Sequence, residues 1–172
     1  MSFAARVRLS LRRPEDRKEI EALEARRAVT AAMSVAAALG VAVDDAVILY
    51  NSNRLVARLL PGDIVVRVSP VGWFSAAREV ELARLLGEET DAPVAGLDPR
   101  VEPRIFVRDD FEVAMWTYFE PMQSRELPPG DYARALERLH GALRRVDMSA
   151  PHFTDFSQRS NGGLPTARSR RT

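Results

Sequence analysis

Hydrophobic positions along the chain change their spacing several times, and each change predicts a new element. Residues 14–39 are rich in Ala, Glu and Arg, and their apolar side chains recur at a loose helical spacing. Pro14 suits the first turn of a helix and Gly40 suits its end, so we expect one long helix or two short ones. The expected apolar stripe comprises Ile20, Leu23, Val29, Ala32, Met33, Ala36 and Leu39.

The next part of the chain has the short apolar runs that are typical of β-strands. These runs lie at residues 47–50, 55–60 and 64–68. Turn-forming residues separate them at 51–53 and 61–63. Two such tight turns predict an antiparallel meander of three strands.

The second half of the chain alternates between helix and strand. Helical spacing returns from Ser75, the expected N-cap, to Glu88. Two more strands are expected at residues 104–107 and 113–119, on either side of a turn at 109–110. A last helix follows a Pro-Pro-Gly sequence, with Asp131 as its expected cap and Leu136, Leu139, Leu143 and Val146 at helical spacing.

This order of elements predicts an α+β fold, with a five-stranded antiparallel sheet and one helix crossing between the third and fourth strands. The expected regions are an N-terminal helical segment (1–40), a lobe that holds the sheet (41–121), a linker with the last helix (122–157) and a tail (158–172). The tail is polar and rich in Arg, without apolar periodicity, and is expected to be disordered.

Composition narrows the class of protein. The chain has 172 residues, 46% of them hydrophobic, which suits one well-buried domain. Its 25 basic and 24 acidic residues give no reason to expect nucleic acid or an anionic membrane as a partner. The absence of Cys excludes disulfides, thiolate metal sites and cysteine catalysis. No apolar run approaches the ~20 residues of a membrane span, and the start lacks a secretory apolar core, so we expect a cytoplasmic protein.

One charged pair is a candidate for chemistry. Arg67 lies inside the third expected strand, between Val66 and Val68, where a cation needs a partner or a path to water. Glu79, early on the next expected helix, is the favoured partner, although spacing leaves Glu81 open. Alternatively, Arg67 points to solvent.

The stretch from Ala37 to Phe156 resembles the small lobe of the aminoglycoside phosphotransferase-like family. The resemblance is carried by four passages in family order, at residues 47–53, 64–83, 113–121 and 135–140. It implies the N-terminal lobe of a protein-kinase-like fold, followed by a hinge and a first large-lobe helix. It also implies a transferase that moves phosphate from ATP or GTP, with Mg, to an alcohol group of a small molecule.

The resemblance also implies roles for individual residues. Arg67 would contact the phosphates and Glu79 would orient it. The loop over the phosphates would comprise Asn51, Ser52 and Asn53, and the hinge that binds the base would comprise Thr117, Tyr118, Phe119 and Glu120. Arg in place of the commoner Lys is a departure, because the two cations are not interchangeable.

The family's catalytic loop is not matched. Its His-Gly-carboxylate motif is echoed by His140-Gly141-Ala142, but Ala142 stands where the carboxylate is required, and the segment has helical spacing. Thr154-Asp155 echoes the metal-binding motif too close to His140 and without the intervening Asn. We therefore expect a nucleotide-binding lobe truncated after about Phe156, as a frameshift or premature stop would leave it, without catalytic residues, metal ligands or turnover of its own. The alternative is a genuine small-lobe protein with a disordered tail.

Two other interpretations remain open. The chain could be a non-catalytic binding or regulatory module that reuses the lobe. It could also be an unrelated α+β domain whose basic tail touches nucleic acid, an idea motivated by Arg159, Arg168, Arg170 and Arg171. If the chain is instead the truncated phosphotransferase lobe, its expected partners are a weakly bound nucleotide and either the missing large lobe or a second copy of the chain, which would cover an exposed apolar patch. Trp116, Phe119 and the last helix are the expected members of that patch.

Overall fold

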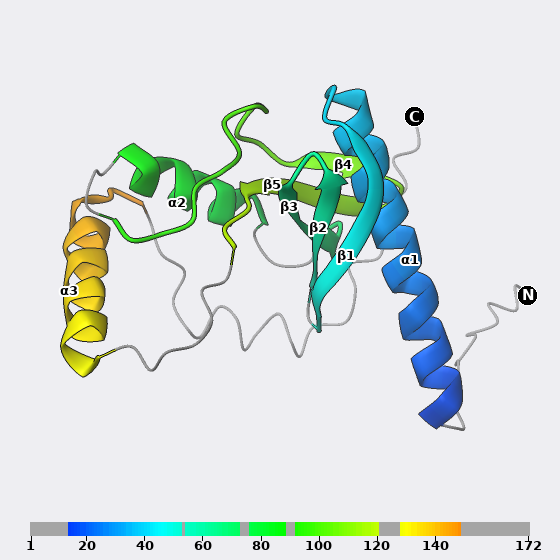
Figure 1. Cartoon of the computed structure of the whole chain (residues 1–172), viewed down its shortest axis with the longest axis horizontal. Coiled ribbons are helices and arrows are strands. Elements are labelled where there is room, and N and C mark those ends of the chain that lie inside the picture. Colours follow the sequence, from blue (N-terminus) through cyan, green and yellow to red (C-terminus); the bar gives the residue numbers. More distant parts are fainter. Residues whose placement is uncertain (1–13, 53, 73–75, 89–91, 121–127, 149–172) are drawn as a thin grey trace, which may run out of the picture.

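The computed structural model describes residues 14–52, 54–72, 76–88, 92–120 and 128–148, with side chains from residue 21 onward (Figure 1). Three helices and five strands lie within these ranges. In chain order they are α1 (Pro14–Ala38), β1 (Val43–Asn51), β2 (Leu55–Pro61), β3 (Ile64–Pro70), α2 (Ala76–Glu88), β4 (Phe106–Arg108), β5 (Phe111–Thr117) and α3 (Pro129–Arg145).

The five strands form one antiparallel sheet in the order β1-β2-β3-β5-β4. Helix α2 occupies the connection between β3 and β4. The predicted α+β class, the antiparallel sheet and the helix between its third and fourth strands are therefore confirmed. The first predicted helix is one element and not two.

Helix α1 covers one face of the sheet (Figure 1). The alternation along β3 points Ile64, Val66 and Val68 toward α1, and all three are buried. The helix contributes mainly small side chains to this core, namely Ala25, Ala28, Ala31, Ala32, Val35 and Ala36. The predicted stripe was wrong at Leu23 and Leu39, which are 59% and 36% exposed, because the alanines form the contact face.

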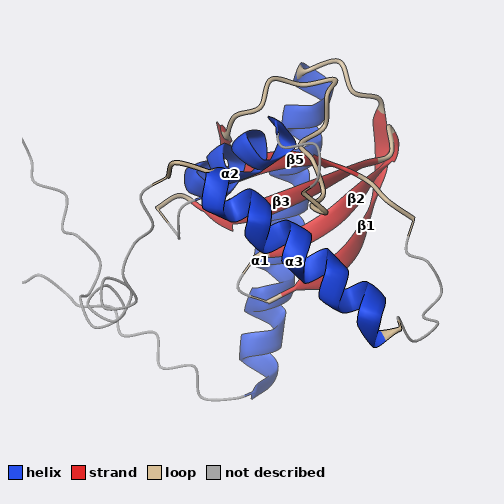
Figure 2. Ribbon diagram, turned by 90° about the vertical axis from the view of Figure 1, so that its left-hand side faces the viewer, coloured by secondary structure: helices blue, strands red, loops and turns tan. Residues whose placement is uncertain are grey.

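Helix α2 packs on the opposite face, at the β5 side of the sheet. Val80 and Ala83 contact Ala114 and Trp116 in a second, smaller core. Helix α3 lies on this side too, away from α1, as Figures 1 and 2 show together. Its only buried residue is Ala142, so this amphipathic helix is mostly exposed.

Several predicted boundaries differ from the structure. Strand β4 begins at Phe106, two residues later than predicted, and β5 ends at Thr117 instead of residue 119. Helix α3 begins at Pro129, because Pro suits a first turn, so Asp131 lies inside that turn and is not the cap. The expected cap Ser75, most of the linker and the expected tail lie outside the described residues.

Candidate functional site

An ion pair joins β3 to α2. Residues 65 and 67 point away from α1, so Arg67 emerges on the α2 side of the sheet. The first turn of α2 presents Glu79 there, and Arg67 Nη1 donates a hydrogen bond to Glu79 Oε1. Glu81 instead accepts hydrogen bonds from Arg84 on its own helix. The predicted Arg67–Glu79 pair is confirmed, so Glu81 is not the partner of Arg67, and the Arg67 side chain is in addition 35% exposed to solvent.

A second arginine, which the sequence analysis missed, binds the same carboxylate. Arg54 Nη1 donates to Glu79 Oε2, so each carboxylate oxygen accepts one guanidinium. Arg54 directly precedes β2, and the β2–β3 register pairs Val56 with Arg67. No sequence spacing predicts a contact between residues 54 and 79, because it depends on how the turn, β3 and α2 meet in space.

Trp116 forms a wall of this site. The Arg67 Cζ atom lies 4.3 Å from the centre of the Trp116 ring, and Trp116 is 5% exposed. An aromatic face attracts a cation and removes water from one side of it, which strengthens the ion pair with Glu79. Trp116 Nε1 is buried and has no hydrogen-bond partner among the described residues. The expectation that Trp116 belongs to an exposed patch is therefore wrong.

The predicted phosphate loop lines a cavity on the α1 side of the sheet. Asn51 and Ser52 contribute to this cavity of about 350 Å³, opposite Glu21 and Glu24 of α1, while Asn53 lies outside the described residues. Neither Arg67 nor Glu79 lines it. The structure therefore does not bring Asn51 and Ser52 into one cavity with Arg67, although Arg54 lines the cavity and also reaches Glu79.

The predicted hinge residues lie at the end of β5. Tyr118 Oη donates to Glu120 at 2.8 Å, and this bond is the main reason why the pKa of Tyr118 is raised. The guanidinium of Arg58 stacks 3.7 Å from the centre of the Tyr118 ring. Phe119 is 63% exposed, as expected of the apolar patch. The side chains of Tyr118 and Glu120 thus lie together beside Arg58 of β2 and are not grouped with Arg67.

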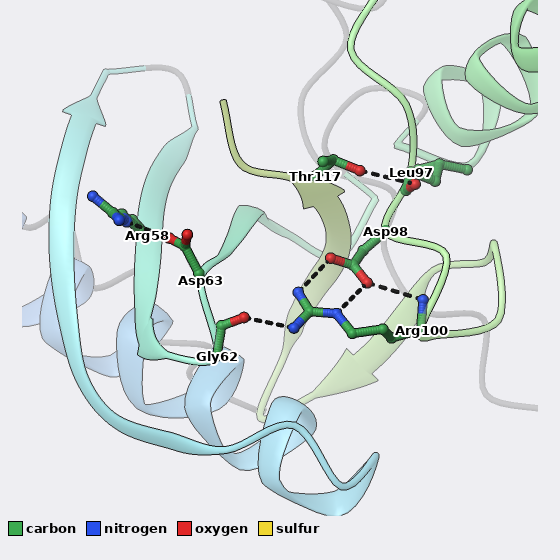
Figure 3. A network of polar contacts seen from close by, with 7 residues as sticks. All are labelled: Arg58, Gly62, Asp63, Leu97, Asp98, Arg100 and Thr117. Carbon is green, nitrogen blue, oxygen red and sulfur yellow. Dashed lines mark hydrogen bonds and ion pairs between the residues drawn. The ribbon is translucent and has the colours of Figure 1, made fainter. Parts of the chain in front are cut away.

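A third polar cluster holds the α2–β4 connection against the sheet (Figure 3). The Asp98 carboxylate accepts hydrogen bonds from Arg100 Nε at 2.8 Å, Arg100 Nη2 at 2.6 Å and the Arg100 backbone N–H at 3.0 Å. Arg100 Nη1 also donates to the carbonyl of Gly62 at 2.6 Å, in the β2–β3 turn. Nearby, Thr117 Oγ1 donates to the Leu97 carbonyl at 3.3 Å. This cluster has a structural role, because its donors and acceptors satisfy one another.

No family model, curated protein or solved structure matches the chain. Within the described ranges, no group of three or more His, Asp or Glu residues is placed to hold a metal ion. A search of the same residues found no helix with the length and apolar character needed to cross a bilayer.

Proposed function

We propose that this chain is the nucleotide-binding lobe of a kinase-like phosphotransferase and that it binds ATP or GTP with Mg²⁺. The observation that carries this proposal is the Arg67–Glu79 ion pair between the third strand and the helix that follows it. In protein kinases, a cation on the third strand contacts the phosphates and a carboxylate on the following helix holds that cation in place. Arg67 and Glu79 have the charges and the relative positions that these roles need, with Arg in place of the commoner Lys.

The segment after β5 is a candidate binding site for the nucleotide base. The backbone groups of residues 118–120 form no hydrogen bond with other described residues, so they can pair with the edge of a purine. Val65 lies beside Trp116 in the β3–β5 ladder and is partly exposed on the same face, which offers an apolar surface for a ring. The lobe thus presents backbone groups for a base and, at Arg67, a cation for the phosphates.

The described residues do not support turnover by this chain alone. His140, Gly141 and Ala142 lie within α3, and the Ala142 side chain is buried, so this segment is a helix and not a catalytic loop. Phosphoryl transfer needs a carboxylate to position the acceptor hydroxyl and ligands to hold Mg²⁺. We therefore propose that this chain binds the nucleotide without transferring its phosphoryl group and that the described residues do not determine the acceptor substrate.

The second candidate is a non-catalytic binding or regulatory module built on the same lobe. It is favoured by the exposure of Phe119 and of Tyr132 and Leu143 on α3, which a partner protein could cover. The two candidates share nucleotide binding without transfer by this chain alone, and they differ in what completes the lobe, a missing large lobe or a partner protein. Release of ADP from Mg-ATP by this chain in the presence of pooled small alcohols would contradict both.

Thermal unfolding of the full chain with Mg-ATP and Mg-GTP tests the common part of the proposal. A ligand at one hundred times its Kd adds about 2.7 kcal/mol to the free energy of unfolding, which raises the midpoint measurably. We expect this rise in the wild type and its loss in Arg67→Ala. Arg84→Ala is the matched control, because the ion pairs of Arg84 with described residues are those to Glu81 and Glu88 on the exposed side of α2. A wild-type midpoint that neither nucleotide moves would contradict nucleotide binding.

A further inference from the structure

Two guanidinium groups converge on one carboxylate at the junction of three elements. Arg54 comes from the end of the β1–β2 turn, Arg67 from β3 and Glu79 from α2. The two arginines bind different oxygens of Glu79, so they lie side by side along its edge. The trio carries a net charge of +1, because two cations share one anion.

Both arginines keep donors for a ligand. A guanidinium has five N–H donors, and within the described residues Arg54 and Arg67 make one hydrogen bond each, both to Glu79. Their side chains are 38% and 35% exposed, so these donors can be reached from solvent. Glu79 therefore orients the pair without saturating it.

We propose that Arg54 and Arg67 form a two-arginine clamp for the oxygens of a phosphate chain, with Glu79 as the residue that positions both. This inference rests on the proposed function for its ligand, the terminal phosphates of a nucleoside triphosphate. Planar guanidiniums bind phosphate oxygens through paired hydrogen bonds, and two of them offset more of the charge of a triphosphate than Arg67 alone. Arg54 thereby adds to the preference for a triphosphate over an uncharged nucleoside.

The surroundings assign different tasks to the two arms. The guanidinium of Arg67 stacks on the Trp116 ring and donates a hydrogen bond to Glu79, so it has little conformational freedom. Arg54 stands at the end of a turn, one residue before the β2–β3 ladder begins at Leu55. We therefore expect the Arg67 side chain to keep its position when the ligand binds and the Arg54 side chain to adjust to the ligand.

Isothermal titration calorimetry of the full chain with Mg-ATP, adenosine and tripolyphosphate tests the clamp. Loss of a charge-assisted hydrogen bond costs about tenfold to a hundredfold in affinity, so we expect Arg54→Gln to weaken Mg-ATP and tripolyphosphate by that factor. Its affinity for adenosine should stay within about twofold. Arg54→Lys should fall between the wild type and Arg54→Gln, because Lys keeps the charge and loses the planar fork.

The control is Arg84→Gln, which makes the same change of residue and charge on the far side of α2. If Arg54→Gln loses no more affinity for Mg-ATP than Arg84→Gln, the clamp is wrong while nucleotide binding stands. Binding of tripolyphosphate that depends on Arg54, without any binding of adenosine or Mg-ATP, would support the clamp and overturn the proposed function. A wild type that binds none of the three compounds overturns both. Unfolding midpoints of Arg54→Gln and Arg54→Lys that match the wild type show that lost binding is not lost folding.

Discussion

At the scale of single residues, the carboxylate of Asp98 is the most deeply buried among the described acidic residues. Its side chain is 3% exposed, and among the described residues its carboxylate accepts hydrogen bonds from Arg100 alone. The Arg100 guanidinium, as the largest cause, lowers the pKa of Asp98 below its ordinary value. The charged form is therefore favoured by folding, and its contribution to stability depends on pH.

Because the folded pKa of Asp98 is lowered, its contribution is complete above the unfolded pKa of about 3.9 and is lost as the pH falls through the folded value. We expect Asp98→Asn to reduce the free energy of unfolding at pH 7 by about 2 kcal/mol. The difference from the wild type should shrink below about pH 4, as measured by urea unfolding across pH. Glu102→Gln is the control, because Glu102 is exposed and should change stability by under about 0.5 kcal/mol. A difference that stays constant down to pH 2 would contradict the pKa assignment.

Of the two arginines of the candidate site, one could be predicted from the sequence and the other could not. Arg67 stands out because a cation between two valines on a strand needs a specific explanation, and a carboxylate on the next helix supplies one. Arg54 gives no such signal, since a basic residue beside a polar turn is ordinary. Its contact with Glu79 is set by the meeting of three elements, which no local pattern encodes.

At the scale of elements, spacing predicted which segments form helices and strands better than it predicted their faces and ends. Burial alternates from Ile64 to Val68 of β3, so one face carries Ile64, Val66 and Val68 and the other carries Val65 and Arg67. Helix α1 has many alanines all around, so its larger residues misled the choice of face. The buried face is the one whose small side chains pack on the strands, and Leu23 lies outside it.

This packing predicts opposite outcomes for two neighbouring alanines of α1. Ala36 is fully buried against the sheet and Ala37 is exposed. We expect Ala36→Leu to lower the free energy of unfolding by about 1–3 kcal/mol, because a close-packed core has no room for three more carbons. Ala37→Leu should change it by less than about 0.5 kcal/mol. Equal effects of the two variants in chemical denaturation would mean that α1 does not use this face.

At the scale of the whole molecule, the two sides of the sheet are unequally covered. Helix α1 covers one face, whereas α2 packs against the β5 side of the other (Figure 1). Strand β1 is an edge strand, and its consecutive residues Val47, Ile48, Leu49 and Tyr50 are each 45–60% exposed. An apolar edge strand is a template for pairing with another chain, and two irregularities in the β1–β2 register weaken that template by bending it.

This edge predicts weak self-association that one charge can suppress. We expect the average molar mass from light scattering to rise with concentration for the wild type and to rise less for Leu49→Lys, because a lysine on an edge strand opposes pairing. Leu23→Lys is the matched control, since Leu23 is also exposed (59%, against 49% for Leu49) but lies on α1 and not on β1. Both substitutions are at exposed positions, so both variants should unfold at the wild-type midpoint. A wild type that stays monomeric at every concentration would contradict association, and an equal effect of Leu23→Lys would place it at another surface.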